Sequence, residues 1–182
     1  MEDKFLIEQV LKGNKNAYKL LVIRYQRPLF SFFKKFGFTS QRIEELAQEV
    51  FLKAYEHLSS FHTEKGTFTS WFFSIAKNLA LNEIKKKTEI LEEMEVLEQL
   101  SVSDSVESID LLLARKLTNE KVQALVMKIP NPFKIPVILS YLEELSIDEI
   151  AVIEKCSIGT VKSRIHRGKL ALKNLVMNEE LI

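Results

Sequence analysis

The end of the chain carries a strip of basic residues whose types suit contacts with nucleic acid. Between Cys156 and Leu175 there are five lysine and arginine residues and no aspartate or glutamate. Val161, Ile165 and Leu172 recur at helical spacing, so they predict an inward face and leave the basic side chains largely outward. Such a helix can hold phosphates with its cations and present side chains to base edges in a DNA major groove. A basic surface that only favours solubility is the alternative.

A second short helix is expected directly before this strip. Ser146 and Glu149 have the spacing of a capping box, in which the two side chains satisfy free backbone N–H groups at a helix start. That helix should end by Cys156, and Ser157 can cap the next helix almost at once. Two short helices joined by a turn of about three residues form a helix-turn-helix. The capping box, the tight turn and the acid-free strip together favour DNA binding.

The first half of the chain has residues that suit an unpaired base. Of the seventeen aromatic residues, fifteen lie between Phe5 and Phe73, and most of them are expected in the core. The aromatic-bearing loop 59–70 leads into a helix on which Asn78 and Asn82, four residues apart, share one face. Aromatic stacking and amide hydrogen bonds at this place could hold one extruded base.

The elements that must position these residues are expected to be helices. Only five glycines and four prolines occur in 182 residues, and apolar residues recur at steps of three and four. The pattern predicts an all-α protein without a convincing strand. The expected helices cover residues 3–13, 16–37, 40–58 with a cap at Ser40, 71–87, 113–129, a helix from 131, and the final pair from 146.

The charge divides the chain into three parts. Residues 1–87 have six more basic than acidic residues, residues 88–120 have seven more acidic than basic ones, and residues 121–182 have two more basic ones. The stretch 88–112 is rich in Glu, Ser and Asp and has no aromatic residue. It is therefore predicted to be an acidic linker between an N-terminal helical bundle, residues 1–87, and a C-terminal helix-turn-helix four-helix domain, residues 113–182.

Several classes of function are disfavoured by what the chain lacks. There is no glycine-rich phosphate loop and no serine–histidine–acid arrangement, so an enzyme is not expected. Cys156 is the only cysteine, and the histidines have no metal-ligand spacing, so no metal or other cofactor is expected. No apolar run approaches the roughly 20 residues of a membrane span, and the N-terminus does not resemble a secretory signal. A cytoplasmic protein without membrane insertion is expected.

The order of these motifs resembles one known family. The stretches IEELAQEVFLKAYEHL and TSWFFSIAKN, followed by SIDEIAVIEKCSIGTVKSRIHRGKLAL, are similar to extracytoplasmic-function (ECF) sigma factors, the two-domain promoter-recognition subunits of bacterial RNA polymerase. The resemblance covers nearly the whole chain except the linker. It implies that the helix 43–58 binds the clamp helices of the largest subunit of core polymerase, with exposed contacts at Glu45, Gln48, Glu49 and Lys53.

The resemblance also implies two contacts with promoter DNA. Capture of a base from the −10 element, together with contacts to its phosphates, is implied for Phe61, Phe68, Lys77, Asn78, Asn82, Lys85 and Lys86. Reading of the −35 element is implied for Ser157, Thr160, Lys162, Ser163, His166, Arg167 and Lys169. Ser74 stands where a basic residue is common in the family. Lys134 and Lys162 stand where arginine is frequent, and lysine cannot bind guanine in a bidentate manner, so the −35 sequence is not transferred from relatives. An anti-sigma protein that clamps the two domains together is common in the family.

Alternatives remain for the linker and for the whole chain. A relaxed coil of about 25 residues spans roughly 25–30 Å, whereas two sites two helical turns apart on DNA are about 70 Å apart. The linker can therefore be extended in a basic channel of the polymerase, fold back over the basic helix, or act as a solvated spacer. A stand-alone helix-turn-helix regulator, with a first domain that dimerises or senses a ligand, is the alternative function.

Overall fold

The computed structural model describes residues 2–92, 119–141 and 145–180, and all the regular elements in these ranges are helical. The N-terminal module, as we call residues 2–92, contains α1 (Asp3–Leu11), α2 (Lys15–Lys34), α3 (Ser40–Glu56) and α4 (Phe68–Glu92), with two short 3₁₀ turns between α3 and α4. The C-terminal module, residues 119–180, contains α6 (Asn119–Lys128), α7 (Asn131–Tyr141), α8 (Ile147–Glu154) and α9 (Ile158–Glu180). The all-α prediction is confirmed.

The predicted linker is only partly covered by these ranges. Helix α4 continues through the first five of its residues, up to Glu92, and the rest of the linker lies outside the described residues. The predicted start of the second domain at residue 113 lies outside them too. The domain boundaries therefore stay a prediction.

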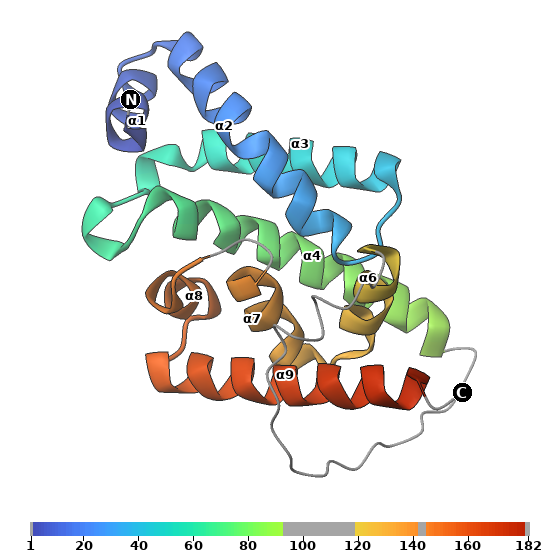
Figure 1. Cartoon of the computed structure of the whole chain (residues 1–182). Helices are drawn as coiled ribbons and strands as arrows, with labels where there is room; N and C mark the ends of the chain where they lie inside the picture. Colours follow the sequence, from blue (N-terminus) through green and yellow to red (C-terminus); the bar gives the residue numbers. More distant parts are fainter. Residues whose placement is uncertain (1, 93–118, 142–144, 181–182) are drawn as a thin grey trace.

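Aromatic side chains hold the N-terminal module together. Helix α2 packs on α1, α3 and α4, and Phe32, Phe36 and Phe73 are almost completely buried between them. The ring centroids of Phe32 and Phe36 are 5.0 Å apart, and those of Phe32 and Phe73 are 5.5 Å apart, both in edge-to-face arrangements. Such pairs add to the free energy gained from burial alone. They fix one face of α4 against the bundle, as the central position of this helix in Figure 1 illustrates.

The start of α3 differs from the expectation by one residue. The cap is Thr39, whose Oγ1 accepts a hydrogen bond from the backbone N of Arg42 at 3.3 Å, and Ser40 is already helical. The predicted cap at Ser40 is therefore wrong. Threonine and serine side chains both suit this role and stand side by side here, so the sequence alone did not separate them.

The helix-turn-helix forms as predicted. Ser146 Oγ accepts from the backbone N of Glu149 at 3.2 Å, and the backbone N of Ser146 donates to Glu149 Oε2 at 3.1 Å, which is the reciprocal capping box. Helix α8 ends at Glu154, and Lys155 turns the chain with a left-handed backbone at φ 51°. Ser157 Oγ then accepts from the backbone N of Thr160 at 3.2 Å and begins α9.

The two modules form one packed body in which α8 lies against α4 (Figure 1). Within the C-terminal module α9 packs mainly on α7, and Gly168 lies at their closest approach. A Cβ atom at this position would lie 2.5 Å from Val137 Cγ2 and 3.2 Å from the backbone O of Phe133. The glycine is therefore required by the close contact of the two helices.

Replacing Gly168 by alanine should lower the free energy of unfolding by about 1–3 kcal/mol, because the added methyl group overpacks the contact with α7. The matched control is Gly159→Ala in the same helix, where a Cβ would meet only Ser157 Oγ at 3.8 Å. That variant should be unchanged or more stable by up to about 1 kcal/mol, since alanine is the better helix former. Urea unfolding followed by circular dichroism measures both, and equal stabilities would contradict the packing argument.

Candidate polymerase and promoter interfaces

The basic face of α9 is open to solvent. Ser157, Lys162, Ser163, His166 and Arg167 are exposed, and Thr160 and Lys169 are half-buried. The inward positions Val161 and Ile165 are buried on the opposite side. Lys169 rests with its ammonium 4.4 Å from the ring centroid of Tyr141, which leaves its charge at the edge of the same face. The structure therefore brings together all seven residues predicted to contact the −35 element.

Two basic residues of the strip, Arg164 and Lys173, face the protein more than the solvent. Arg164 turns toward α8 and donates from its Nη1 atom to Glu154 Oε2 at 2.8 Å. Lys173 is only 8% exposed. The strip is therefore less uniformly available to DNA than its composition indicates, and its solvent-facing charge is concentrated at Lys162 and Arg167.

The outward face of α4 carries the predicted polar residues for the −10 element. Asn78, Asn82, Lys85 and Lys86 are all exposed. Near the start of the helix, the half-buried rings of Phe61 and Trp71 lie beside each other, with centroids 5.7 Å apart. The amides and the ring of Trp71 lie on α4, and the ring of Phe61 lies in the loop before it, so both kinds of group that the capture of an extruded base requires are present here.

Phe68 lies in the core and not at this surface. It is 5% exposed, and its ring packs within 5.6 Å of those of Tyr25, Phe61 and Trp71. Tyr25 in turn donates a hydrogen bond to Asp3 Oδ2 at 2.5 Å, and burial raises the pKa of its phenol. Phe68 therefore supports the surface rings from below, and its own ring is not available to stack on a base.

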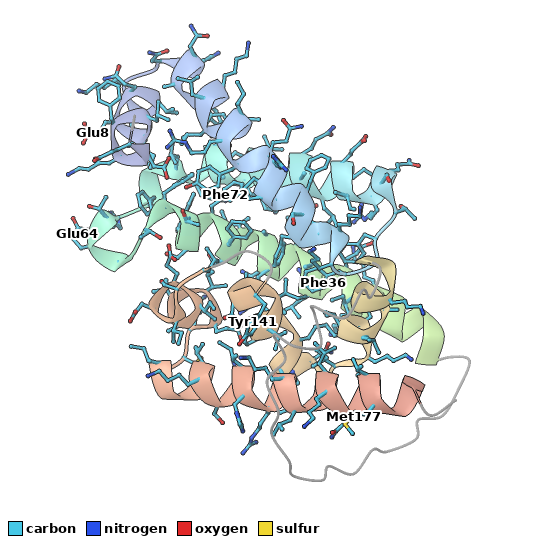
Figure 2. The ribbon with its side chains drawn as sticks, in the orientation of Figure 1. Glu8, Phe36, Glu64, Phe72, Tyr141 and Met177 are labelled. Atoms are coloured by element: carbon cyan, nitrogen blue, oxygen red, sulfur yellow. The ribbon has the colours of Figure 1, made fainter. Side chains whose placement is uncertain are left out.

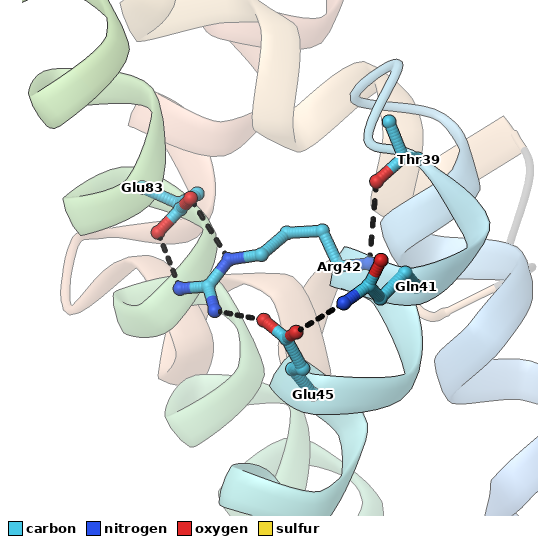
Figure 3. A network of polar contacts seen from close by, with 5 residues as sticks. All are labelled: Thr39, Gln41, Arg42, Glu45 and Glu83. Atoms are coloured by element: carbon cyan, nitrogen blue, oxygen red, sulfur yellow. Dashed lines mark hydrogen bonds and ion pairs between the residues drawn. The ribbon is translucent and has the colours of Figure 1, made fainter.

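A polar network joins α3 to α4 next to Asn82. Arg42 donates to both carboxylate oxygens of Glu83, from Nε at 2.9 Å and from Nη2 at 2.6 Å, and its Nη1 donates to Glu45 Oε2 at 2.6 Å (Figure 3). The hydrogen bonds from Arg42 lower the pKa of Glu83. A cavity of about 280 Å³ opens beside this network, lined by Arg42, Leu46, Glu49, Leu79, Asn82, Glu83, Lys85 and Lys86. Bidentate pairing fixes direction as well as distance, so the network sets the position of Asn82 relative to α3.

An apolar groove lies between α2 and α3. It has a volume of about 580 Å³ and is lined by Lys15, Tyr18, Val22, Gln48, Phe51, Leu52 and Tyr55. Leu52 and Tyr55 are 57% and 42% exposed, although both are large hydrophobic side chains. This groove was not predicted from the sequence. The signal available was the stripe of Gln48, Leu52 and Tyr55 at helical spacing on the outward side of α3.

Of the four predicted polymerase contacts, Glu45 and Glu49 lie on the part of α3 that faces α4, away from this groove. Gln48 lines it, and the side chains of Glu49 and Lys53 form an ion pair at 3.5 Å on the same helix. Glu45 is exposed but is engaged by Arg42. The four residues therefore lie on the outward part of α3 but not around one site, and each of them already has a charged partner or an apolar neighbour.

Lys77 is not exposed in the way that the other predicted polar −10 residues of α4 are. Its ammonium lies 3.1 Å from Glu154 Oε1 and donates to the backbone O of Ile153 at 3.1 Å, so it is held by α8. Sequence reasoning missed Glu154, because no local pattern connects two residues that are 77 positions apart.

Comparisons with known proteins agree with this arrangement. Residues 21–90 match the family model of sigma-70 region 2, and residues 119–172 match that of sigma-70 region 4. The ECF RNA polymerase sigma factor SigW of Bacillus subtilis is 32% identical over 175 residues, which are 92% of each chain. The ECF RNA polymerase sigma-E factor of Escherichia coli (strain K12) is 31% identical over 184 residues, which are 97% of this chain and 95% of that one.

Solved structures share the fold at lower identity. CnrH, in complex with the cytosolic domain of CnrY, has a TM-score of 0.70 at 23% identity and covers 97% of both chains. The sigma factor RpoE of Bartonella quintana, in complex with the anti-sigma factor NepR, has a TM-score of 0.67 at 20% identity and covers 88% of this chain and 96% of that one.

The two matched regions define a sigma-70 family protein. Within that family the chain belongs to the ECF type, which directs RNA polymerase to promoters through regions 2 and 4 and is not an enzyme. In the part of the chain that the structure describes, no helix is both long enough and apolar enough to cross a membrane.

Replacing Glu83 by glutamine should lower the free energy of unfolding at neutral pH by about 1 kcal/mol, a value kept small because both partners are partly exposed to solvent. Glu83 has a pKa below its ordinary 4.5 in the folded chain, so its carboxylate stabilises the fold above pH 4.5. This contribution is lost as the pH falls through the lowered value. Urea unfolding at several pH values should therefore show the two proteins converging in acid.

The control for this measurement is Glu56→Gln, which removes an exposed carboxylate at the end of α3. Its difference from the wild type should be small at every pH. A difference for Glu83→Gln that stays constant from neutral pH to about pH 3 would contradict the assignment.

Proposed function

We propose that this ECF sigma factor binds core polymerase through the groove between α2 and α3, holds an unpaired −10 base on α4, and reads the −35 duplex with α9. The observation that carries the proposal is the exposed pair Asn78 and Asn82 on the face of α4 opposite its buried aromatic residues. The division into a −10 and polymerase domain (1–87), an acidic linker (88–112) and a −35 domain (113–182) belongs to this proposal.

The polymerase contact depends on the exposed hydrophobic side chains of the groove. A coiled coil from the largest subunit can insert apolar side chains between α2 and α3, where Leu52 and Tyr55 would lose their contact with water. Glu45, Glu49 and Lys53, farther round the outward part of α3, would then fix the register of the coiled coil and speed up association, since charges at the edge of an interface act more on rate and specificity than on affinity. Gln48 lies between these two kinds of contact.

The −10 contact combines stacking with hydrogen bonds. Unpairing and unstacking a base costs a few kcal/mol, and stacking on an aromatic ring returns about 1–3 kcal/mol. Phe61 and Trp71 supply the rings that are partly open, with Phe68 beneath them. The amides of Asn78 and Asn82 supply donors and acceptors for a base edge, and Lys85 and Lys86 lie where they can hold the adjacent phosphates.

The −35 contact uses the first three turns of α9. Ser157, Thr160 and Ser163 are short polar residues that let the helix approach base edges, while Lys162, Arg167 and Lys169 bring positive charge to the groove. His166 completes the outward face. Arginine can bind guanine in a bidentate manner, whereas lysine acts as a point charge, so Arg167 is the strongest candidate for a specific base contact.

The partners proposed for this chain are core polymerase, promoter DNA and an anti-sigma factor. The relatives CnrH and RpoE were solved with CnrY and with the anti-sigma factor NepR, which supports a partner of that kind here. Action on polymerase and chromosomal DNA also supports a cytoplasmic location.

The purified chain should bind core polymerase, and the mixture should start run-off transcription from a defined promoter. Leu52→Lys should weaken the affinity for core polymerase more than about tenfold, because it places a charge in the apolar groove. Leu11→Lys is the control, since Leu11 is equally exposed at 55% but lies on α1 outside the groove. Failure of the wild type to bind polymerase, or equal effects of both variants, would contradict the proposal.

Asn78→Ala and Arg167→Ala should affect different steps at that promoter. Loss of the amide removes hydrogen bonds of about 1–2 kcal/mol, so promoter opening should fall about tenfold, as read from the permanganate reactivity of −10 thymines. Arg167→Ala should weaken binding to the −35 duplex and reduce the salt dependence by about one phosphate contact. Unchanged thymine reactivity in Asn78→Ala would rule out the assigned −10 site.

A further inference from the structure

The contact between the two modules is centred on Lys77 of α4. Its Nζ atom donates to the backbone O of Ile153 at 3.1 Å and lies 3.1 Å from Glu154 Oε1. The side chain of Lys77 is 13% exposed and that of Glu154 is 7% exposed. The last carbonyl groups of a helix have no donor within the helix and carry its negative dipole end. Lys77 therefore satisfies the end of α8 from the opposite module.

Glu154 is bound from both sides of this contact. Its Oε2 accepts a hydrogen bond from Arg164 in α9 at 2.8 Å, which stays inside the C-terminal module. Its Oε1 is buried and accepts no hydrogen bond within the described residues, so the ammonium of Lys77 is the charge that balances it there. Removing Lys77 without letting water in would leave a buried charge only partly compensated, which is costly.

A second contact holds the other end of α8. Thr67 Oγ1, just before α4, donates to Glu149 Oε1 at 2.9 Å, while Glu149 Oε2 serves the capping box of α8. Gly66 has a φ of 143°, and a Cβ there would lie 3.0 Å from Ser70 Oγ and 3.5 Å from Val152 Cγ1. Helix α8 is thus held at both its ends, by the loop before α4 and by a lysine within α4.

The packed arrangement does not fit a promoter. Helix α8 lies between α4 and α9, and packed helices are about 8–10 Å apart, so the two reading helices are separated by roughly 20 Å. Sites two helical turns apart on DNA are separated by about 70 Å. The two modules must therefore come apart before α4 and α9 can occupy the −10 and −35 elements of one promoter.

We propose that the contact between α4 and α8 is an autoinhibitory latch, in which the carboxylate of Glu154 occupies the place of a DNA phosphate on Lys77. This inference rests on the proposed −10 contact of α4, with Lys77 as the phosphate contact that the family resemblance implies. When the latch opens, Lys77 exchanges a carboxylate for a phosphate, and Glu154 keeps Arg164 as its partner. Ligands that bind only the open form, such as promoter DNA, shift the population toward it.

The latch is tested on the full-length chain by Glu154→Gln, which keeps the shape of the side chain and removes its charge. The radius of gyration from small-angle X-ray scattering should increase. The affinity for a mixed-sequence single-stranded oligonucleotide of about 12 nucleotides should rise about fivefold to tenfold, since the closed form no longer competes. Asp148→Asn is the control, because it removes an exposed charge from the same helix, and it should behave as the wild type.

Thr67→Val serves as a second variant that leaves the bonds of α8 and α9 to each other untouched. It removes the hydrogen bond to Glu149 from the other module, together with the bond that Thr67 Oγ1 accepts from the backbone N of Ser70 at the start of α4. It should change both readouts in the same direction by a smaller factor. If circular dichroism shows that Glu154→Gln has lost helix, the radius of gyration and the oligonucleotide affinity of Thr67→Val test the latch instead.

An unchanged radius and affinity in folded variants would overturn the latch, even where the chain still directs transcription. A wild-type chain that binds neither polymerase nor DNA would instead overturn the proposed function.

Discussion

Burial of the aromatic face of α4 is the constraint on which the rest of the structure depends. Phe72 and Phe73 are almost completely buried, so the rotation of this helix about its axis is fixed. The helical period then places Asn78 and Asn82 toward solvent and Lys77 toward α8. Figure 2 shows Phe72 within the N-terminal module, on the side of α4 away from Tyr141 and α9. The burial of this one face of α4 therefore sets the direction of both the proposed base-binding face and the contact between the modules.

The net charge of the chain does not show which charged residues are available to a partner, because several of them form ion pairs within the fold. The formal charge is +1, yet acidic and basic residues are not paired at random. Glu83 and Glu45 are used to hold Arg42, and Glu154 is used to hold Arg164 and Lys77. Lys162 and Arg167 have no ion pair within the described ranges and lie on the exposed face of α9. Acidic residues thus serve the architecture, and cations remain at the surface where a phosphate backbone is expected.

Short-range features could be predicted from the sequence, and contacts across the fold could not. The capping box of Ser146 and Glu149 and the shared face of Asn78 and Asn82 depend on spacings of three and four residues, and both were found as expected. The burial of Phe68 and the pairing of Lys77 with Glu154 depend on which helices meet, and no local pattern encodes that. The groove beside Leu52 could be predicted in part. The sequence shows the stripe of outward residues on α3, but it does not show that α2 forms the other wall.

The central claim is that one chain alternates between a packed form and a form whose modules grip separate promoter elements. It is tested most directly by the distance between the modules, measured by energy transfer between dyes at positions 8 and 177 in a variant with Cys156 replaced by serine. Glu8 and Met177 are exposed and belong to α1 and α9, far apart in Figure 2. The efficiency should be measurable in the free chain and should fall further when polymerase and promoter are added, because the modules move apart. An efficiency that stays the same in the promoter complex would contradict the claim.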